Sequence, residues 1–417
     1  MRLDLLRKEL GSYTMSERLF ILFAMLVNFL ICAEYAIVRP VSNSLFIQAF
    51  GAELFPYAWL ATVPLNILIV SLYNSLLPRL GCFKLFFVSI VVVAGGNLFF
   101  ACFFERFASL PFIFYVWKEL YVLLMFQQLW SVIHSTVQID RAKYLYGFFF
   151  GIGGLGSLFG SAFPGFFAVT YGSEKLLFLS CPLYLFLLLF YWRMTRHAAV
   201  HHVTTEFKRH SVASLQSFLH GCQLIARSRF LIFALLIVVL MQFSSALIDF
   251  QFNAFLGKTI ADKDLRTEYG ARVLGIVHAL TVSMQFIGSY FLIRLVGLKR
   301  SYYALPLLIG GGVLSYALFP LFPLLGLSYI AVKSLDFSLF GILREMLYVP
   351  LKSDEKFRAK AVIDIFAYRS AKALASFLIL ALQVFFIDVS PILTYTTLGL
   401  SGLWIAVTAW NFKRAVA

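Results

Sequence analysis

Long apolar stretches separated by short polar breaks dominate the pattern of hydrophobic and polar positions along the chain. With a window of about 19 residues, this pattern predicts twelve segments long enough to cross a hydrocarbon core about 30 Å thick. The predicted spans cover approximately residues 19–38, 55–77, 84–104, 110–134, 145–169, 176–193, 229–252, 272–293, 301–320, 321–341, 360–387 and 391–411. Backbone groups inside a bilayer find no water to bond, so each span must be helical. The pattern therefore predicts an all-α membrane protein with twelve transmembrane helices.

The longest polar break divides these spans into two groups of six. We predict an N-terminal six-helix half at residues 1–193, a cytoplasmic central loop at 194–228 and a C-terminal six-helix half at 229–417. The loop contains several histidines, which suit either a metal or anionic-lipid site or a linker that faces anionic lipid. Because no acidic or cysteine ligand accompanies the histidines, the linker is favoured and no metal is expected.

Matched positions in the two halves indicate an internal duplication. Arg141-Ala142-Lys143 precedes a span rich in small residues, and Arg358-Ala359-Lys360 does so at the corresponding place in the second half. The same sequence offset relates Glu119 to Asp336. Two related six-helix halves are the arrangement of the major facilitator transporters. We therefore expect a major-facilitator-like fold in which spans one, four, seven and ten line a central cavity.

The composition excludes a soluble globular enzyme. Hydrophobic residues make up 61% of the chain and charged residues 13%, whereas a typical soluble domain has about 25% charged residues. The net charge of +15 first suggests a nucleic-acid partner, but most Lys and Arg residues gather on one side of the predicted spans. The positive-inside rule assigns that side, with both termini, to the cytoplasm. The charge is therefore expected to face the lipid bilayer, and no nucleic acid is expected as a partner.

Two other patterns are interpreted as packing. Gly151-Ile152-Gly153-Gly154-Leu155-Gly156 matches the dinucleotide-binding GxGxxG pattern, but no strand–helix–strand unit surrounds it. In a membrane helix such small residues allow a neighbouring helix to approach closely, and Gly310-Gly311-Gly312 has the same interpretation. The many Phe and Tyr residues are interpreted as lipid-facing or interfacial mass. No cofactor is expected.

Ionisable residues inside the spans are the candidate functional residues. A charge at mid-membrane costs at least about 2.5–3.5 kcal/mol on insertion scales and therefore usually faces a cavity or a partner. Besides Lys118, the candidates for substrate binding or coupling are Glu34, Arg39, Glu119, Asp249, Lys333, Asp336, Arg344, Asp364, Arg369 and Lys372. Charges of both signs suit an anionic or zwitterionic solute. The alternative is that they only hold helices together, as Lys333 can with Asp336 and Asp364 with Lys372.

One stretch of sequence carries a family resemblance. Residues 344–372, REMLYVPLKSDEKFRAKAVIDIFAYRSAK, with weaker motifs around Tyr35 to Arg39 and from Lys118 to Gly160, resemble the nucleotide transport proteins. These are the ATP/ADP translocases (ADP,ATP carriers) of plastids and of obligate intracellular bacteria. The resemblance implies twelve spans, nucleotide binding, and either exchange of ATP for ADP plus phosphate or nucleotide import. It also implies a multi-pass protein of a bacterial inner membrane, and we expect a monomer.

The resemblance also implies a set of four membrane charges, in the order Lys, Glu, Glu and Lys. The first Glu corresponds to Glu119, the second to Asp249 and the last Lys to Arg344. The chain departs from the pattern at Ser42, which stands where the family has its first Lys, and at Asn43, which replaces an Asp. Asp336 replaces a further family Lys. We expect Arg39 to supply part of the missing positive charge.

These observations together predict a transporter that works by alternating access and is not an enzyme. The GxxxxGK[ST] pattern of ATP hydrolysis is absent from the sequence, so transport is expected to be exchange or gradient-driven. Arg39 and Arg344 are expected to meet an anionic substrate, and Glu119 and Asp249 to pair with these arginines when the site is empty. Two alternatives remain: a proton-coupled carrier of another anionic or zwitterionic metabolite, with Glu34 and Asp249 as proton sites, and a membrane scaffold without transport activity.

Overall fold

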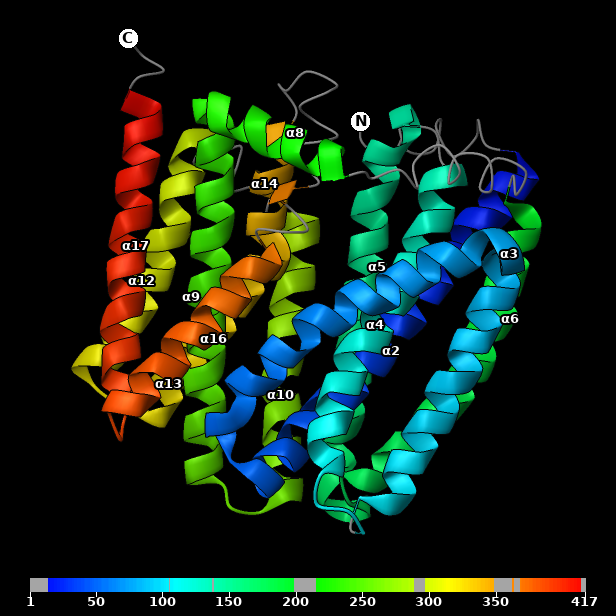
Figure 1. Ribbon diagram of the computed structural model, residues 1–417, viewed down its shortest axis with the longest axis horizontal. Helices are drawn as coiled ribbons and strands as arrows, with labels where there is room; N and C mark the ends of the chain where they lie inside the picture. The colour runs from blue at the N-terminus through cyan, green and yellow to red at the C-terminus, as the bar shows by residue number, and fades with distance from the viewer. Residues whose placement is uncertain are drawn as a thin grey trace. The chain divides into compact units, whose positions relative to one another are not determined.

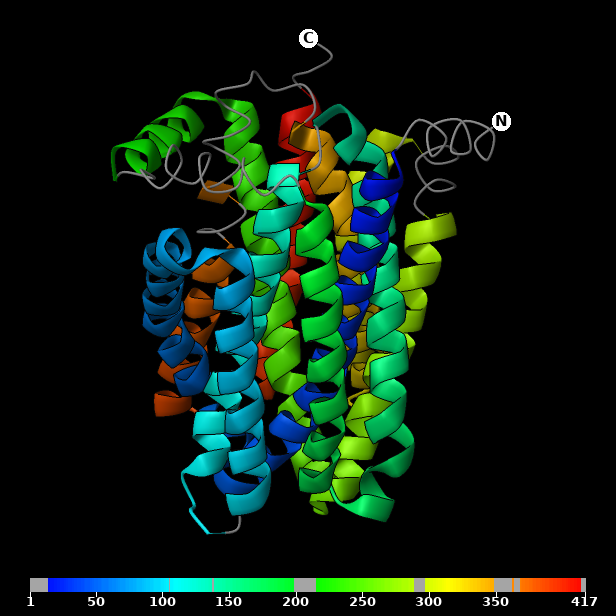
Figure 2. The same ribbon diagram turned by 90° about the vertical axis from the view of Figure 1, so that its right-hand side faces the viewer.

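The computed structural model describes residues 14–104, 106–136, 139–198, 215–288, 297–348, 362–363 and 368–413. Within these ranges all regular structure is helical, as predicted (Figure 1, Figure 2). The helices are α2 Met15–Phe50, α3 Phe55–Phe103, α4 Leu110–Thr136, α5 Ile139–Tyr171, α6 Ser180–His197, α8 Leu215–Arg227, α9 Arg229–Thr259, α10 Lys263–Ser283, α12 Leu298–Leu318, α13 Phe322–Leu335, α14 Gly341–Tyr348, α16 Tyr368–Phe385 and α17 Ser390–Lys413. Short 3₁₀ helices occur at Ala52–Leu54 (η1) and Glu174–Leu179 (η2), and π-helical segments at Met284–Gly288 (η3) and Asp336–Phe340 (η4).

Nine helical stretches of the described residues are long and apolar enough to cross a membrane, by length and composition. The longest, Ala52–Phe103, contains two predicted spans. Gly81 interrupts it with a φ of 74° and a ψ of 166°, a conformation that glycine adopts without a steric penalty. The predicted count of twelve stays a prediction, because residues 289–296 and 364–367 lie outside the described residues.

The chain divides into two compact units. The first unit comprises Met1–Ser42, Leu65–Val212 and Thr267–Gly275, and the second comprises Asn43–Pro64, Ala213–Arg266 and Ile276–Ala417. The end of α2 and the start of α3 thus group with the second unit, and part of α10 groups with the first. The predicted halves at 1–193 and 229–417 remain a prediction.

Helices α2, α3, α4, α5 and α6 contribute side chains to the core of the first unit. Its side chains are large and apolar, with Phe20, Phe86, Met125 and Leu187 at 2% exposure or less. Aromatic rings fill much of this space, and Phe86 stacks on Tyr191 with ring centroids 3.7 Å apart. Such close packing fixes which residues of these helices can meet inside the unit.

Helix α5 lies directly against α2 through glycines. A Cβ atom at Gly156 would collide with the backbone carbonyl of Phe29, and one at Gly160 with that of Ala33. At Gly153 the added atom would lie 2.7 Å from Nδ2 of Asn28. The GxGxxG stretch is therefore a packing surface, which confirms the interpretation from the sequence.

Replacing Gly156 with alanine is expected to force α5 away from α2. A small-to-large change in a packed interior costs about 1–3 kcal/mol, occasionally more, and the obstacle here is backbone that cannot rotate aside. The measurement is the thermal unfolding temperature of purified protein, which should fall. Gly311→Ala in α12 is the matched control, because its Cβ would meet nothing within 4 Å. Equal effects of both substitutions would contradict this packing.

Helix α9 is the most buried of the long apolar helices in the second unit. It contacts α13, α16 and α17, and α12 in turn contacts α13 and α17 (Figure 1). The Ser228 hydroxyl caps the first turn of α9 by accepting a hydrogen bond from the Leu231 amide, as serine commonly does at this position. Gln242, Ser245 and Asp249 are spaced about one turn apart along α9, so they lie on the same side of this helix.

Candidate functional site

The predicted site residues fall into two groups, one in each unit. Glu34, Arg39 and Glu119 belong to the first unit. The second unit contains Asp249, Lys333, Asp336, Arg344 and Lys372. Asp364 and the side chain of Arg369 lie outside the described residues. Each group is therefore considered on its own.

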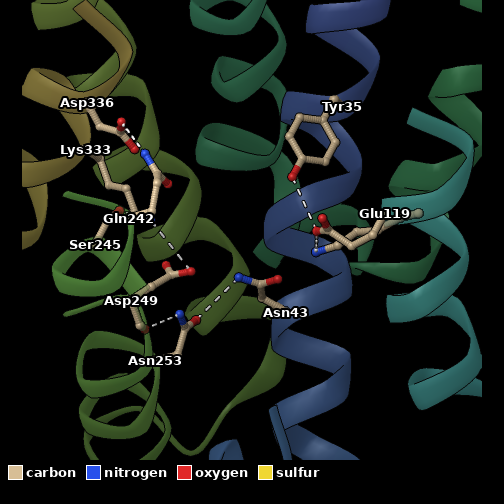
Figure 3. A network of polar contacts seen from close by, with 10 residues as sticks. Tyr35, Asn43, Glu119, Gln242, Ser245, Asp249, Asn253, Lys333 and Asp336 are labelled. Atoms are coloured by element: carbon tan, nitrogen blue, oxygen red, sulfur yellow. Dashed lines mark hydrogen bonds and ion pairs between the residues drawn. The ribbon is translucent and has the colours of Figure 1, made fainter. Parts of the chain in front are cut away.

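In the first unit, α4 buries a lysine beside Glu119. The side chain of Lys118 is 1% exposed, and its Nζ lies 3.7 Å from Oε1 of Glu119. The same Nζ lies 4.1 Å from the centre of the Tyr115 ring, within the range of a cation–π contact. From α2, the Tyr35 hydroxyl donates to Oε1 of Glu119 at 3.4 Å (Figure 3). Two helices thus fix one carboxylate, which is 26% exposed.

Arg39 lies on α2, about one turn after Tyr35. Its guanidinium carbon is 5.9 Å from the centre of the Tyr35 ring, and the residue is half-buried. Tyr35 therefore contacts both a predicted cation and a predicted carboxylate of this unit. Sequence reasoning did not select it, because a single tyrosine in an apolar span carries no distinguishing signal.

A second polar network in the first unit surrounds Glu34, which is fully buried. Its Oε1 accepts hydrogen bonds from the hydroxyl of Tyr121 on α4, at 2.7 Å, and of Tyr184 on α6, at 2.6 Å. Asn97 of α3 donates to both hydroxyls. The interpretation of the tyrosines as lipid-facing or interfacial is wrong for Tyr121 and Tyr184, because their hydroxyls find a partner that lipid cannot offer.

In the second unit, Lys333 of α13 joins two residues of α9. Its Nζ lies 3.7 Å from Oδ2 of Asp249 and donates to Oγ of Ser245 at 3.0 Å (Figure 3). The side chains of Lys333 and Asp249 are 9% and 13% exposed. A buried ion pair of this kind needs further hydrogen bonds to offset the loss of hydration. Ser245 supplies one of them.

The carboxylate of Asp336 lies beside the same face of α9. Its Oδ1 accepts a hydrogen bond from Nε2 of Gln242 at 2.8 Å (Figure 3). Arg344 of α14 is half-buried, and its charge acts on Asp336. The sequence had suggested Lys333 as a partner of Asp336 on one helical face; the charge of Lys333 acts on Asp336, and both residues also contact α9. Gln242 and Ser245 were missed by sequence reasoning, because neutral polar residues cost too little in a span to stand out.

Asn43, which stands where the resemblance expects an Asp, lies in the neighbourhood of Asp249. Its Nδ2 donates to Oδ1 of Asn253 at 3.4 Å, and Nδ2 of Asn253 donates to the carbonyl oxygen of Asp249 at 2.7 Å (Figure 3). The preceding residue, Ser42, is fully buried, and its hydroxyl has no hydrogen-bond partner among the described residues. The two departures from the family pattern therefore leave small neutral side chains where the family has charges.

Lys372 of α16 contacts the ring of Trp59. Its Nζ is 4.8 Å from the centre of the Trp59 ring, which again is a cation–π distance. Its predicted partner, Asp364, lies outside the described residues.

The sequence predicted arginines as the partners of Glu119 and Asp249. Lysines also lie near these carboxylates: Lys118 is within ion-pair distance of Glu119, and Lys333 is within ion-pair distance of Asp249.

Two π-helical segments, η3 and η4, contact each other close to Asp336. Residues of η3 contact residues of η4, Nε2 of Gln285 donates to the carbonyl oxygen of Phe337 at 2.9 Å, and the Ser338 hydroxyl contacts Sδ of Met284 at 3.5 Å. Asp336 is the first residue of η4. Single π turns inside α-helices are rare and occur frequently at functional sites.

The donor set of these clusters suits an organic anion rather than a metal ion. The described residues contain no group of three or more His, Cys, Asp or Glu that is able to hold a metal. They offer buried ammonium groups, neutral donors and carboxylates that neutralise the cations. In a low-dielectric environment such cations bind an anion strongly when it displaces the carboxylate partner.

A family model matches one segment of the second unit. Residues 321–414 match the family model described as "TLC ATP/ADP transporter". The match includes Lys333, Asp336 and Arg344, together with the REMLYVPLKSDEKFRAKAVIDIFAYRSAK stretch. The resemblance expected from the sequence is thus confirmed over this segment.

Solved structures show the fold of nearly the whole chain. A mutant form of the nucleoside transporter NupG aligns with a TM-score of 0.69 at 13% identity, covering 93% of this chain and 98% of that one. The POT family transporter PepTSo gives a TM-score of 0.65 at 10% identity, with 95% and 98% covered. The xylose transporter XylE from E. coli gives 0.60 at 14% identity, with 94% and 95% covered.

These likenesses establish the fold, and the predicted major-facilitator-like architecture is confirmed. The chain is a multi-pass helical membrane protein with a major-facilitator-like fold, and its residues 321–414 match the TLC ATP/ADP transporter family model.

Proposed function

We propose that this transporter carries nucleotides, either by exchanging ATP for ADP or by importing nucleotides, through alternating access. One observation carries the proposal: the segment that matches the ATP/ADP transporter model contributes Lys333, a buried cation of the second unit whose Nζ lies 3.7 Å from Asp249 and donates to Ser245. A nucleotide phosphate has the charge and the acceptor oxygens to replace both.

The substrate step in this proposal is an exchange of counter-ions. In the empty carrier Asp249 neutralises Lys333, and Glu119 neutralises Lys118. An arriving phosphate takes the place of the carboxylate, so the positive charge of the lysine is compensated by a negative charge throughout the exchange. Arg344 and Arg39 add further positive charge, as expected from the sequence. The carboxylates regain their lysines when the substrate leaves, which returns the carrier to its empty state.

We further propose that the protein lies in a bacterial inner membrane as a monomer, with both termini in the cytoplasm. The asymmetry of Lys and Arg between the two sides of the spans supports this orientation. The halves at residues 1–193 and 229–417, joined by the cytoplasmic loop 194–228, would then move against each other during the cycle.

Uptake of radiolabelled ATP and ADP into intact cells that express the chain tests the proposal. Cells with the wild-type chain are expected to accumulate label, and unlabelled nucleotides should compete. Arg344→Ala is expected to lower uptake about tenfold or more, because a hydrogen bond to a charged group is worth about 1.5–3 kcal/mol. The control is Arg227→Ala, an exposed arginine of α8 in the same unit. Its uptake should match the wild type.

Two results would contradict the proposal. If no phosphorylated compound accumulates or competes, nucleotides are not the substrate, although the transporter fold stands. If Arg344→Ala and Arg227→Ala lower uptake equally, Arg344 has no special place in the transport site.

A further inference from the structure

Glu34 is a carboxyl group buried in the first unit without a cation beside it. The residue is 0% exposed, and among the described residues no Lys, Arg or His nitrogen lies within 4.0 Å of its oxygens. Asp249, a carboxylate in the corresponding first span of the second half, has Lys333 at 3.7 Å. The two halves thus treat their buried carboxyl groups differently. One is neutralised by a lysine, and the other has only uncharged neighbours.

The hydrogen bonds of the Glu34 network lead to a single carboxyl oxygen, Oε1. Nε1 of Trp117 donates to Oδ1 of Asn97 at 3.2 Å. Nδ2 of Asn97 donates to the Tyr184 hydroxyl at 2.6 Å, and that hydroxyl donates to Oε1 of Glu34. The Tyr121 hydroxyl donates to the same Oε1. Since each tyrosine has a single proton, neither has a second one to offer to Oε2.

The second oxygen, Oε2, is buried and has no hydrogen-bond partner among the described residues. An ionised carboxylate would place half of its charge on this atom without a donor or a cation, which is among the most costly arrangements inside a protein. In a neutral carboxylic acid the two oxygens differ. The carbonyl oxygen accepts two hydrogen bonds, as Oε1 does, and the other oxygen carries the proton.

Among the described residues, the helices packed around Glu34 supply only tyrosine hydroxyls as further titratable groups of this network. Helix α3 contributes Asn97, α4 contributes Trp117 and Tyr121, and α6 contributes Tyr184. On the α5 side the neighbouring backbone of Ala33 meets Gly160. Glu34 is therefore the group of this network at which a proton is gained or lost near neutral pH, because tyrosine ionises only near pH 10 even in water.

We propose that Glu34 is a proton-binding site of the transport cycle, with the proton on Oε2 in this conformation. The proposal rests on the transport function proposed above and adds a proton to its cargo. The carboxylate takes a proton from water on one side of the membrane, forming an O–H bond at Oε2. It returns the proton to water on the other side when the helices of the network separate enough to hydrate it. No electron transfer and no further reactant is involved.

An infrared measurement tests the protonation without any substrate. A neutral carboxylic acid in an apolar site has a C=O stretching band separate from that of a carboxylate, and Glu34→Gln should remove one such band from purified protein at neutral pH. Glu53→Gln, an exposed carboxylate in η1, should leave the spectrum of neutral acids unchanged. If Glu34→Gln removes no band, the proposal is overturned, whatever the substrate is.

Transport in proteoliposomes tests the role of the proton. In the wild type a pH gradient, alkaline inside, should accelerate net nucleotide uptake. Glu34→Gln can neither gain nor lose a proton, so the ratio of its uptake with the gradient to its uptake without the gradient should fall to about one. Glu34→Asp keeps the carboxyl group and should retain a response to the gradient. Glu53→Gln should behave like the wild type.

The outcomes separate the two proposals. Counterflow in the wild type without any gradient response would overturn the proton site and leave nucleotide transport intact. A gradient response that survives Glu34→Gln would assign the proton elsewhere and also overturn it. If Glu34→Gln does not fold, Glu34→Asp decides, because loss of its gradient response contradicts the proposal. Absence of counterflow in the wild type would instead refute nucleotide transport, and the infrared band would still decide the state of Glu34.

Discussion

Lys333→Met is expected to abolish uptake and to reduce the amount of folded protein in the membrane. The substitution removes the cation that lies 3.7 Å from Asp249 and leaves a carboxylate that is only 13% exposed. Removing one partner of a buried ion pair costs about 3–5 kcal/mol, because the other charge stays buried without compensation. Transport rate per folded molecule and the amount of monodisperse protein are both measured. Asp249→Asn should have a similar effect on the amount of folded protein.

The double variant Lys333→Met with Asp249→Asn distinguishes folding from function. It contains neither charge, so the amount of folded protein should return toward the wild-type value, whereas uptake should stay absent. Lys258→Met is the matched control, since its ion pair with Asp388 lies in the same unit at 4.0 Å but is 62% and 58% exposed. Such exposed pairs contribute about 0–1 kcal/mol. Recovery of uptake in the double variant would show that the pair only holds α9 and α13 together.

Lys118→Met is expected to lower uptake by at least tenfold while the protein still folds. Methionine fills a similar apolar volume, and the remaining carboxylate of Glu119 is 26% exposed and keeps the Tyr35 hydroxyl. The loss of charge is therefore less damaging to folding here than at Lys333, but the ammonium group is no longer present to meet an anion. Uptake and thermal unfolding of the purified variant are compared with those of Lys84→Met, an exposed lysine of α3. Unchanged uptake in Lys118→Met would remove Lys118 from the transport site.

Hydropathy and glycine patterns predicted most of the helical architecture. Membrane spans carry an unusually strong sequence signal, because a span needs a long segment in which most residues are apolar. Gly153 and Gly156 were correctly interpreted as packing positions, because they lie in an apolar span and no strand–helix–strand unit surrounds them. The signal is weaker for α10 and α16, which fall outside the set of nine apolar stretches.

Partners across helices were harder to predict than the charges themselves. Glu119, Asp249 and Lys333 stood out because charges are rare in spans, but the choice of lysine as partner depends on how α4, α9 and α13 are rotated. Sequence spacing does not contain that rotation. Tyr121, Tyr184, Asn97 and Gln242 were missed for a different reason: each is neutral, and its importance arises only when a buried carboxyl group lies within hydrogen-bond distance.

The π segment η4 bears on how related sequences are to be aligned with this one. A regular α-helix turns about 100° per residue, so Lys333 and Arg344, eleven positions apart, would lie on nearly the same face of an unbroken helix. The longer i to i+5 repeat at Asp336–Phe340 accommodates about one additional residue and rotates Arg344 away from that face by roughly a third of a turn. A relative with one residue fewer between positions 336 and 340 could form an unbroken α-helix, in which ten steps of about 100° leave the two cations roughly a quarter of a turn apart, as they are here. A one-residue gap there consequently preserves the direction of both charges, whereas an ungapped alignment to a regular helix would place them wrongly on one face.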